Sequence, residues 1–88
     1  MERENIYIGK KPVLNYVTAL VTALQKSDTV DVKARGRNIS IAVDVVEVTK
    51  RSFVTDLKYV EIKCGTEKLG DPNNLRNVST MTITVSKA

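Results

Sequence analysis

Apolar residues in the first part of the chain follow two different periods. Ile6 and Ile8 alternate with their neighbours over residues 5–9, which predicts a short strand with one buried face. Over residues 12–26 the apolar positions recur every three or four residues, as in a helix with one buried stripe. These positions are Val13, Leu14, Val17, Leu20, Val21 and Leu24. Pro12 stands in the first turn, where a helix needs no backbone N–H from it.

The middle of the chain continues with one clear segment and one ambiguous segment. Residues 29–36, "TVDVKARG", alternate and predict a second strand with one buried face. Residues 38–53 are rich in β-branched residues and begin like a strand, yet their apolar residues also form one helical stripe. The segment is longer than a usual strand, and Asn38 suits the N-cap of a helix. We therefore expect a helix over residues 38–53.

Two further alternating segments, residues 57–65 and 79–87, each predict a strand with one apolar face. Cys64 lies on the apolar side of the first segment, so we expect it to be buried as a small apolar residue. Residues 66–77, "TEKLGDPNNLRN", contain more turn-forming residues than a tight hairpin needs. The two strands are therefore expected to form a long hairpin with a projecting arm.

The predicted element order is β-α-β-α-β-β, which indicates an α+β fold. We expect a two-layer sandwich of two helices on a four-stranded mixed sheet, with the last two strands extended as the hairpin arm. The chain has 88 residues and contains no internal repeat or linker, so we expect a single domain over residues 1–88. The core of so short a chain is lean, which favours a partner subunit.

The charge balance favours a polyanionic partner. Fourteen Lys and Arg residues against ten Asp and Glu residues give a net charge of +4. An excess of this size matters mainly through its placement. No apolar run approaches the roughly 18 residues of a membrane span, and no leader segment opens the sequence. We expect a cytoplasmic protein that does not act at a membrane.

Enzyme chemistry has few residues to use in this sequence. Histidine is absent, which excludes a Ser-His or Cys-His nucleophile pair and a histidine metal ligand. Asp44 and Glu47 stand three residues apart, but a solvated helix face explains them better than an acid/base pair. Residues 34–38, "ARGRN", lack the following Gly-Lys-Ser/Thr of a nucleotide-binding loop. We expect no enzyme activity, catalytic residue, metal, cofactor or small-molecule substrate.

Four cations stand at the two predicted strand-to-helix junctions, Lys10 and Lys11 at the first and Arg35 and Arg37 at the second. If the first two strands are parallel neighbours, the crossover helix brings both junctions to one edge of the sheet. The helix N-termini there add partial positive charge and free N–H groups, which suits phosphate. A phosphate backbone would also relieve the repulsion between the two lysines. The alternative is that these loops carry solvated charges and that Gly36 only supplies a positive φ.

Four further residues are candidates for contacts with a ligand or a partner, and each also has a purely structural explanation. Lys68 and Arg76 give the hairpin a basic character suited to a minor groove, although the arm could equally be a solvated loop. Tyr16 lies off the expected apolar stripe, where its hydroxyl could reach a phosphate or its ring could pack at the helix edge. Phe53, the single phenylalanine, could be a core residue or an interface anchor.

Three ordered segments carry a family resemblance: "IGKKPVLNYV", "KARGRNIS" with the following "AVD" and "VE", and "NVST" with "TI". They resemble the Alba family of small basic archaeal chromatin proteins, and the similarity runs from about residue 5 to residue 85. The resemblance implies a β-α-β-α-β-β fold similar to the C-terminal domain of a bacterial translation initiation factor. It also implies a homodimer that binds double-stranded DNA without strong sequence preference, and often RNA, and that condenses DNA at the chromosome or nucleoid.

The resemblance assigns roles to particular residues. It identifies Lys10 and Lys11 as central phosphate contacts, with Lys10 also the candidate for acetylation, which would remove one cation. It implies that Lys68 and Arg76 belong to an arm that lies along the minor groove. It also implies that Phe53 makes contacts between dimers on DNA. The paired arginines, Arg35 and Arg37, match its "RGR" loop. The acids in the hairpin tip reduce its positive charge relative to many members and weaken the expectation of tight groove insertion.

The sequence is therefore interpreted as a dimeric DNA-binding protein that contacts mainly phosphates and has low sequence specificity. One alternative is an RNA-binding protein of the same fold that acts on structured RNA. Tyr7, Tyr16 and Tyr59 are too few and too scattered in sequence to form an obvious base-stacking platform. A second alternative, of another class, is a protein-assembly module in which the charge only aids solubility.

Overall fold

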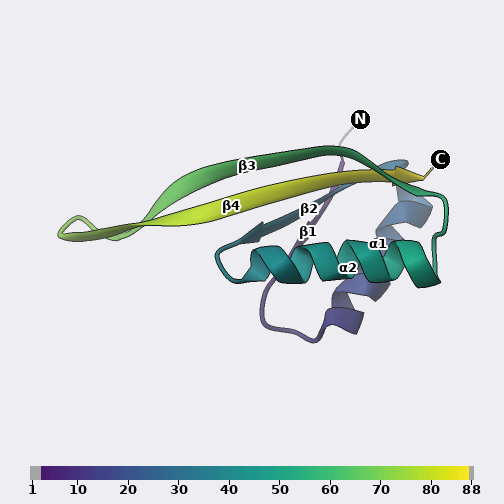
Figure 1. Cartoon of the computed structure of the whole chain (residues 1–88), viewed down its shortest axis with the longest axis horizontal. Helices are drawn as coiled ribbons and strands as arrows, with labels where there is room; N and C mark the ends of the chain where they lie inside the picture. Colours follow the sequence, from purple (N-terminus) through teal and green to yellow (C-terminus); the bar gives the residue numbers. More distant parts are fainter. Residues whose placement is uncertain (1–2, 88) are drawn as a thin grey trace.

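The computed structural model describes residues 3–87 and contains a mixed four-stranded sheet with two helices on one face (Figure 1). The elements are β1 (Glu4–Tyr7), α1 (Val13–Lys26), β2 (Thr29–Arg35), α2 (Asn38–Ser52), β3 (Leu57–Asp71) and β4 (Asn74–Lys87). The strand order across the sheet is β1-β2-β4-β3. The predicted α+β class and β-α-β-α-β-β order are confirmed. No helix within the described range is long and apolar enough to cross a membrane.

The sheet contains one parallel pair and two antiparallel pairs. β1 runs parallel to β2, with Ile6 opposite Val32, and α1 forms the crossover between them. β2 pairs with β4, and β4 pairs with β3, in antiparallel ladders. Ile8 lies just beyond β1, and its N–H still donates to the Lys33 carbonyl oxygen at 2.9 Å. The parallel pairing that the junction argument requires is therefore present.

The core lies between the helices and the strands β1, β2 and β4. Its fully buried side chains include Leu20, Leu24, Val30, Val32, Val45, Val46, Ile83 and Val85. The buried stripe of α1 includes Tyr16 and leaves Leu14 64% exposed, so the expected positions of these two residues were wrong. The stripe is centred on Val17 and Leu20, which puts position 16 inside it and position 14 at its border.

The bounds of the helices differ slightly from the prediction. Pro12 is the N-cap of α1 and precedes its first turn. The expected helix over 38–53 is confirmed as Asn38–Ser52, but Arg37 occupies the N-cap and Asn38 is the first helical residue. The Asn38 side chain instead donates its Nδ2–H to the Ile8 carbonyl oxygen at 3.3 Å. This amide therefore bonds to the neighbouring junction and not to its own helix.

The long hairpin arm is confirmed, and it extends well beyond the helices (Figure 1). Its ladder continues to the pair Asp71–Asn74, so most of the expected turn segment 66–77 is strand. The reversal is only two residues long, and Gly70 enters it with φ 117°. A Cβ at Gly70 would collide with the Asn74 carbonyl oxygen, so the turn requires glycine there.

The expected burial of one face of β3 holds for Leu57 at its start and was wrong for Ile62 and Cys64. Ile62 and Cys64 point to the helix side of the sheet, yet both are exposed. The reason is geometric: β3 is an edge strand, and α1 and α2 pack over the other three strands. Alternation in the sequence showed which residues share a face, but not whether an element covers that face.

Candidate nucleic-acid interface

The two strand-to-helix junctions lie together at one end of the β1–β2 pair (Figure 1). They are linked by the bond from the Asn38 amide to the Ile8 carbonyl oxygen. Lys10 and Lys11 occupy the first junction, and Arg35 and Arg37 the second; all four are exposed. We call this group the junction cluster. The convergence predicted from the parallel crossover is therefore present in the fold.

Both helices at the junction cluster begin without a side-chain cap. Pro12 and Arg37 occupy the N-caps, and neither makes a side-chain hydrogen bond to its helix. Neither α1 nor α2 has an acidic residue in its first turn. The partial positive charge of the two helix ends is therefore not offset by a nearby carboxylate of the same turn, and free N–H groups remain for an anion.

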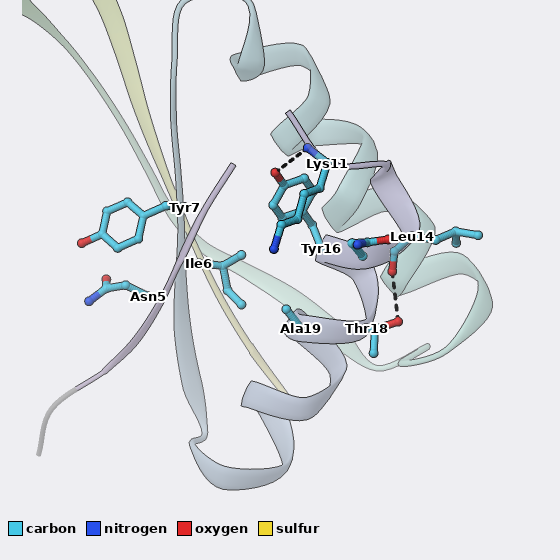
Figure 2. A pocket seen from close by; sticks show the side chains of 9 residues that line it. Asn5, Ile6, Tyr7, Lys11, Leu14, Tyr16, Thr18 and Ala19 are labelled. Carbon is cyan, nitrogen blue, oxygen red and sulfur yellow. Dashed lines mark hydrogen bonds between the residues drawn. The ribbon is translucent and has the colours of Figure 1, made fainter. Parts of the chain in front are cut away.

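Tyr16 fixes the first junction from the core side through hydrogen bonds to its backbone. Its ring is buried, with only 8% of the residue exposed. Its hydroxyl oxygen accepts hydrogen bonds from the N–H of Gly9 at 2.8 Å and from the N–H of Lys11 at 3.0 Å, the second of which is drawn in Figure 2. A Cβ at Gly9 would lie 3.2 Å from this hydroxyl, so the close approach favours glycine. The hydroxyl thus orients the lysine loop. Of the two expected roles of Tyr16, packing of the ring is present, within the buried stripe and not at the helix edge. A contact of the hydroxyl with a phosphate stays a prediction.

The second junction is tied to the base of the arm. Arg35 forms an ion pair with Glu67 of β3, at 3.1 and 3.4 Å to its two carboxylate oxygens. The N–H of Gly36 donates to the Ser79 carbonyl oxygen at 2.8 Å, and Gly36 has φ 58°, which supports the conformational explanation for this glycine. The ion pair joins residues 32 positions apart, and only the strand register brings them together.

The two arm cations do not lie on one face. Leu69 pairs with Arg76 and Lys68 pairs with Asn77, so Lys68 and Arg76 project from opposite sides of the ribbon. Both are exposed and lie beyond Glu67, away from the junction cluster. The arm therefore offers single cations on each side and not a continuous basic stripe.

Phe53 lies at the other end of α2 from the junction cluster. It follows the last helical residue and is 60% exposed, so it is not a core residue. Fifteen helical residues separate it from Arg37, a distance of about 22 Å along the helix. Phe53 is therefore placed for a contact that is separate from the one at the cationic end.

An apolar surface borders α2 on its β3 side. It consists of Val43, Tyr59, Ile62 and Cys64, all exposed, and we call it the α2–β3 patch. The Tyr59 hydroxyl donates a hydrogen bond to the Glu47 carboxylate, one turn after Val43, which connects the helix to the strand. Partial burial raises the pKa of Tyr59 to about 12, and the carboxylate acts in the same direction. The raised pKa therefore keeps the Tyr59 hydroxyl protonated, as a donor to Glu47, into the alkaline range where an ordinary tyrosine ionises.

Metal-ligating side chains do not gather anywhere in residues 3–87: no group of three or more Cys, Asp or Glu residues lies close enough to hold an ion. The junction cluster combines four exposed cations with two helix N-termini, an arrangement of the kind that suits phosphate groups.

Comparison with known proteins identifies close relatives over nearly the whole length. The family model for Alba matches residues 4–66. "DNA/RNA-binding protein Alba" of Thermoplasma acidophilum is 47% identical over 89 residues, with 99% of this chain and 100% of the relative covered. "DNA/RNA-binding protein Alba 1" of Archaeoglobus fulgidus is 40% identical, with 99% of each chain covered. The solved structure of Alba from Thermoplasma volcanium has a TM-score of 0.90 and 45% identity, and the match covers 96% of this chain and 100% of that one.

Replacing Tyr16 with Phe should destabilise the fold and loosen the first junction. The change leaves the N–H groups of Gly9 and Lys11 without their acceptor, which should cost about 1–3 kcal/mol of unfolding free energy. Urea denaturation measures the cost, and amide hydrogen exchange at both positions reports the loosening. Tyr7→Phe is the matched control, because it removes a hydroxyl from an exposed ring and should change stability by less than about 0.5 kcal/mol. Equal effects of the two changes would contradict the assigned role of Tyr16.

Proposed function

Because this chain belongs to the Alba family, we propose that it is a homodimer that binds double-stranded DNA mainly through phosphate contacts. Relatives that carry the name DNA/RNA-binding protein support nucleic acid as the ligand. The observation that carries the proposal is the junction cluster, in which four exposed cations and two uncapped helix N-termini meet at one end of the sheet. Contacts to phosphates carry no base information, so sequence specificity is low.

Electrostatics explains why the junction cluster suits a phosphate backbone. Lys10 and Lys11 repel each other in the free protein, and phosphates between them and the arginines would relieve that repulsion. The lysine loop is held by the Tyr16 hydroxyl, so less backbone freedom is lost when the ligand binds. Acetylation of Lys10, which is exposed, would remove one of the four cations and weaken binding.

The arm extends the proposed interface beyond the junction cluster. Lys68 and Arg76, on opposite faces of the ribbon, could each meet one wall of a minor groove. The carboxylates of Glu67 and Asp71 repel phosphates and weaken this contact. Glu67 also forms an ion pair with Arg35 in the free protein. We therefore assign most of the affinity to the junction cluster and give the arm a supporting role.

Dimerisation is supported by the α2–β3 patch. An exposed apolar surface on so small a chain is the expected signature of a protein interface. A symmetric dimer through this patch would double the cations and provide two arms. Phe53, at the far end of α2, is then free to join one dimer to the next on DNA. Such assembly would serve a cytoplasmic, chromosome-associated role in organising and condensing the nucleoid.

RNA is the second candidate ligand, because the relatives are named for both nucleic acids. Phosphate contacts alone do not separate a DNA duplex from structured RNA. Competition between a DNA duplex and a structured RNA of equal length decides which one is preferred.

A salt series tests the main proposal directly. Four cations in each of two subunits make eight phosphate contacts, which predict a log–log salt slope of about −7 on a mixed-sequence DNA duplex. The double change Lys10→Ala/Lys11→Ala should make the slope shallower by roughly two to four units, because the dimer loses four contacts. A wild-type slope shallower than about −2 would show that the junction cluster is not the main site.

Replacing Glu67 with Gln should strengthen duplex binding. The change removes an acid beside the junction cluster and releases Arg35, which should raise affinity roughly 1.5- to 5-fold. Glu61→Gln is the matched control: it makes the same change in charge on β3, but Glu61 lies near Lys63, at 3.9 Å, and not near Arg35. Fluorescence anisotropy with a labelled duplex measures both variants. If Glu61→Gln has the same effect, only net charge matters and the ion pair has no specific role.

Replacing Ile62 with Asp should disrupt the dimer. A charge in the middle of the α2–β3 patch should weaken dimerisation on the order of 100-fold, since the carboxylate would have to be buried without a partner. Sedimentation velocity over a concentration series measures the effect, and circular dichroism verifies the fold. Leu14→Asp introduces the same charge at a comparably exposed apolar residue on α1 and should leave the dimer intact. A dimer unaffected by Ile62→Asp would exclude this patch as the interface.

A further inference from the structure

The face of the sheet opposite the helices carries an ordered row of side chains. Tyr7 of β1 pairs with Lys33 of β2, Lys33 with Thr82 of β4, and Thr82 with Lys63 of β3. These residues alternate with the core residues of each strand, so they point away from the helices. Figure 2 shows Tyr7 on the side of β1 opposite Ile6 and α1. The row crosses all four strands and spans three strand spacings, about 14 Å.

Tyr7 is the aromatic residue of this row. The residue is 68% exposed and takes no part in the core. The ammonium of Lys33 lies 6.0 Å from the ring centroid, at the outer limit of a cation–π contact. The row therefore begins with an exposed aromatic ring that has a cation over one of its two faces and leaves the other face open for stacking.

The charges of this face leave Lys33 available to an anion. Asp31 is held by Arg3 at 3.3 Å and by the Thr84 hydroxyl at 2.6 Å. Glu61 lies 3.9 Å from Lys63, and Glu67 pairs with Arg35. Within residues 3–87, Lys33 has no carboxylate within salt-bridge distance. A phosphate on this face could therefore bind the Lys33 ammonium without first breaking an ion pair within the protein.

A hollow of about 410 Å³ lies beside the ring. It is lined by Tyr7, Lys33, Arg35, Glu67, Thr80 and Thr82, among others. Gly65 pairs with Thr80 across the β3–β4 ladder, and a Cβ at this glycine would lie 3.1 Å from the Thr80 hydroxyl oxygen, so the absent side chain leaves that hydroxyl uncrowded. The volume is within the range of small-ligand sites, and the threonine hydroxyls supply donors and acceptors.

We propose that this open sheet face is a second nucleic-acid site, which binds an unpaired single-stranded segment. One base stacks on the Tyr7 ring, neighbouring phosphates lie at Lys33 and Lys63, and the threonine hydroxyls meet sugar or base edges in the hollow. An unpaired strand is required because a paired base has its π-face covered within the duplex. The inference rests on the nucleic-acid-binding function proposed above. Its stacking ring and its lysines lie outside the junction cluster, with which the hollow shares only Arg35, and it uses a different form of the ligand.

Substitutions at Tyr7 test the proposal with a short mixed-sequence single-stranded RNA, and with DNA of the same sequence. Tyr7→Leu should weaken single-strand binding roughly ten-fold, because it keeps apolar volume but removes the stacking ring. Tyr7→Phe should bind within about twofold of wild type, and Tyr7→Leu should leave duplex binding within the same limit. The residue is exposed, so these variants should fold normally. Single-strand binding that is absent in wild type, or unchanged in Tyr7→Leu, would overturn the proposal.

A fluorescence measurement reports stacking itself. The chain contains no tryptophan, so Tyr7→Trp introduces one fluorophore at the site. Its emission should be quenched by the single strand, and Tyr7→Trp/Lys33→Gln should need several-fold more ligand for the same quenching. Thr22→Trp, at an exposed residue of α1 on the other side of the sheet, is the control and should show no such quenching. Bound single strand without quenching at position 7 would exclude stacking there.

Lys10→Ala/Lys11→Ala distinguishes this inference from the proposed function. If the double variant loses duplex affinity while Tyr7→Leu changes nothing, the junction proposal holds and the sheet-face site is wrong. If Tyr7→Leu loses single-strand affinity while the lysine variant retains duplex binding, the sheet-face site holds and the junction proposal is wrong.

Discussion

The parallel pairing of β1 with β2 is the constraint on which the arrangement of this surface depends. A parallel pair needs a crossover connection, and α1 provides it. Both strands therefore finish at the same end of the sheet, and both helices begin there. An antiparallel β1 would have moved the lysine junction to the other end of β2, about 23 Å away for seven residues. The junction cluster follows from chain direction as much as from its basic residues.

Two side-chain contacts connect this end of the sheet to the rest of the molecule. The Tyr16 ring belongs to the core, while its hydroxyl binds the backbone of the lysine loop, so core packing determines the shape of that loop. The Arg35–Glu67 ion pair joins the second junction to the base of the arm. Both contacts couple a structural element to an exposed cation, and both therefore influence how positive charge is presented.

Incomplete coverage of the sheet produces the other two surfaces. Helices of 14 and 15 residues pack over β1, β2 and β4, and the helix side of β3 is left with exposed apolar residues such as Ile62. The opposite face of the sheet carries Tyr7 beside Lys33 and the hollow next to them. A lean fold thus offers three surfaces of different chemistry: cationic at the junctions, apolar beside α2, and mixed aromatic and cationic on the open face.

The sequence by itself determined the elements, their order and the basic residues at both junctions, because periodicity and turn chemistry are local properties of the chain. The ambiguous segment 38–53 was correctly predicted as a helix from its length and stripe. Only the tertiary structure decided that Tyr16 is buried and Leu14 exposed, that Cys64 is uncovered, and that Arg35 meets Glu67. The same is true of Tyr7 and Lys33, which are 26 positions apart in the sequence and adjacent in the parallel ladder. Local patterns show which residues share a face, whereas strand register and the placement of helices decide what that face meets.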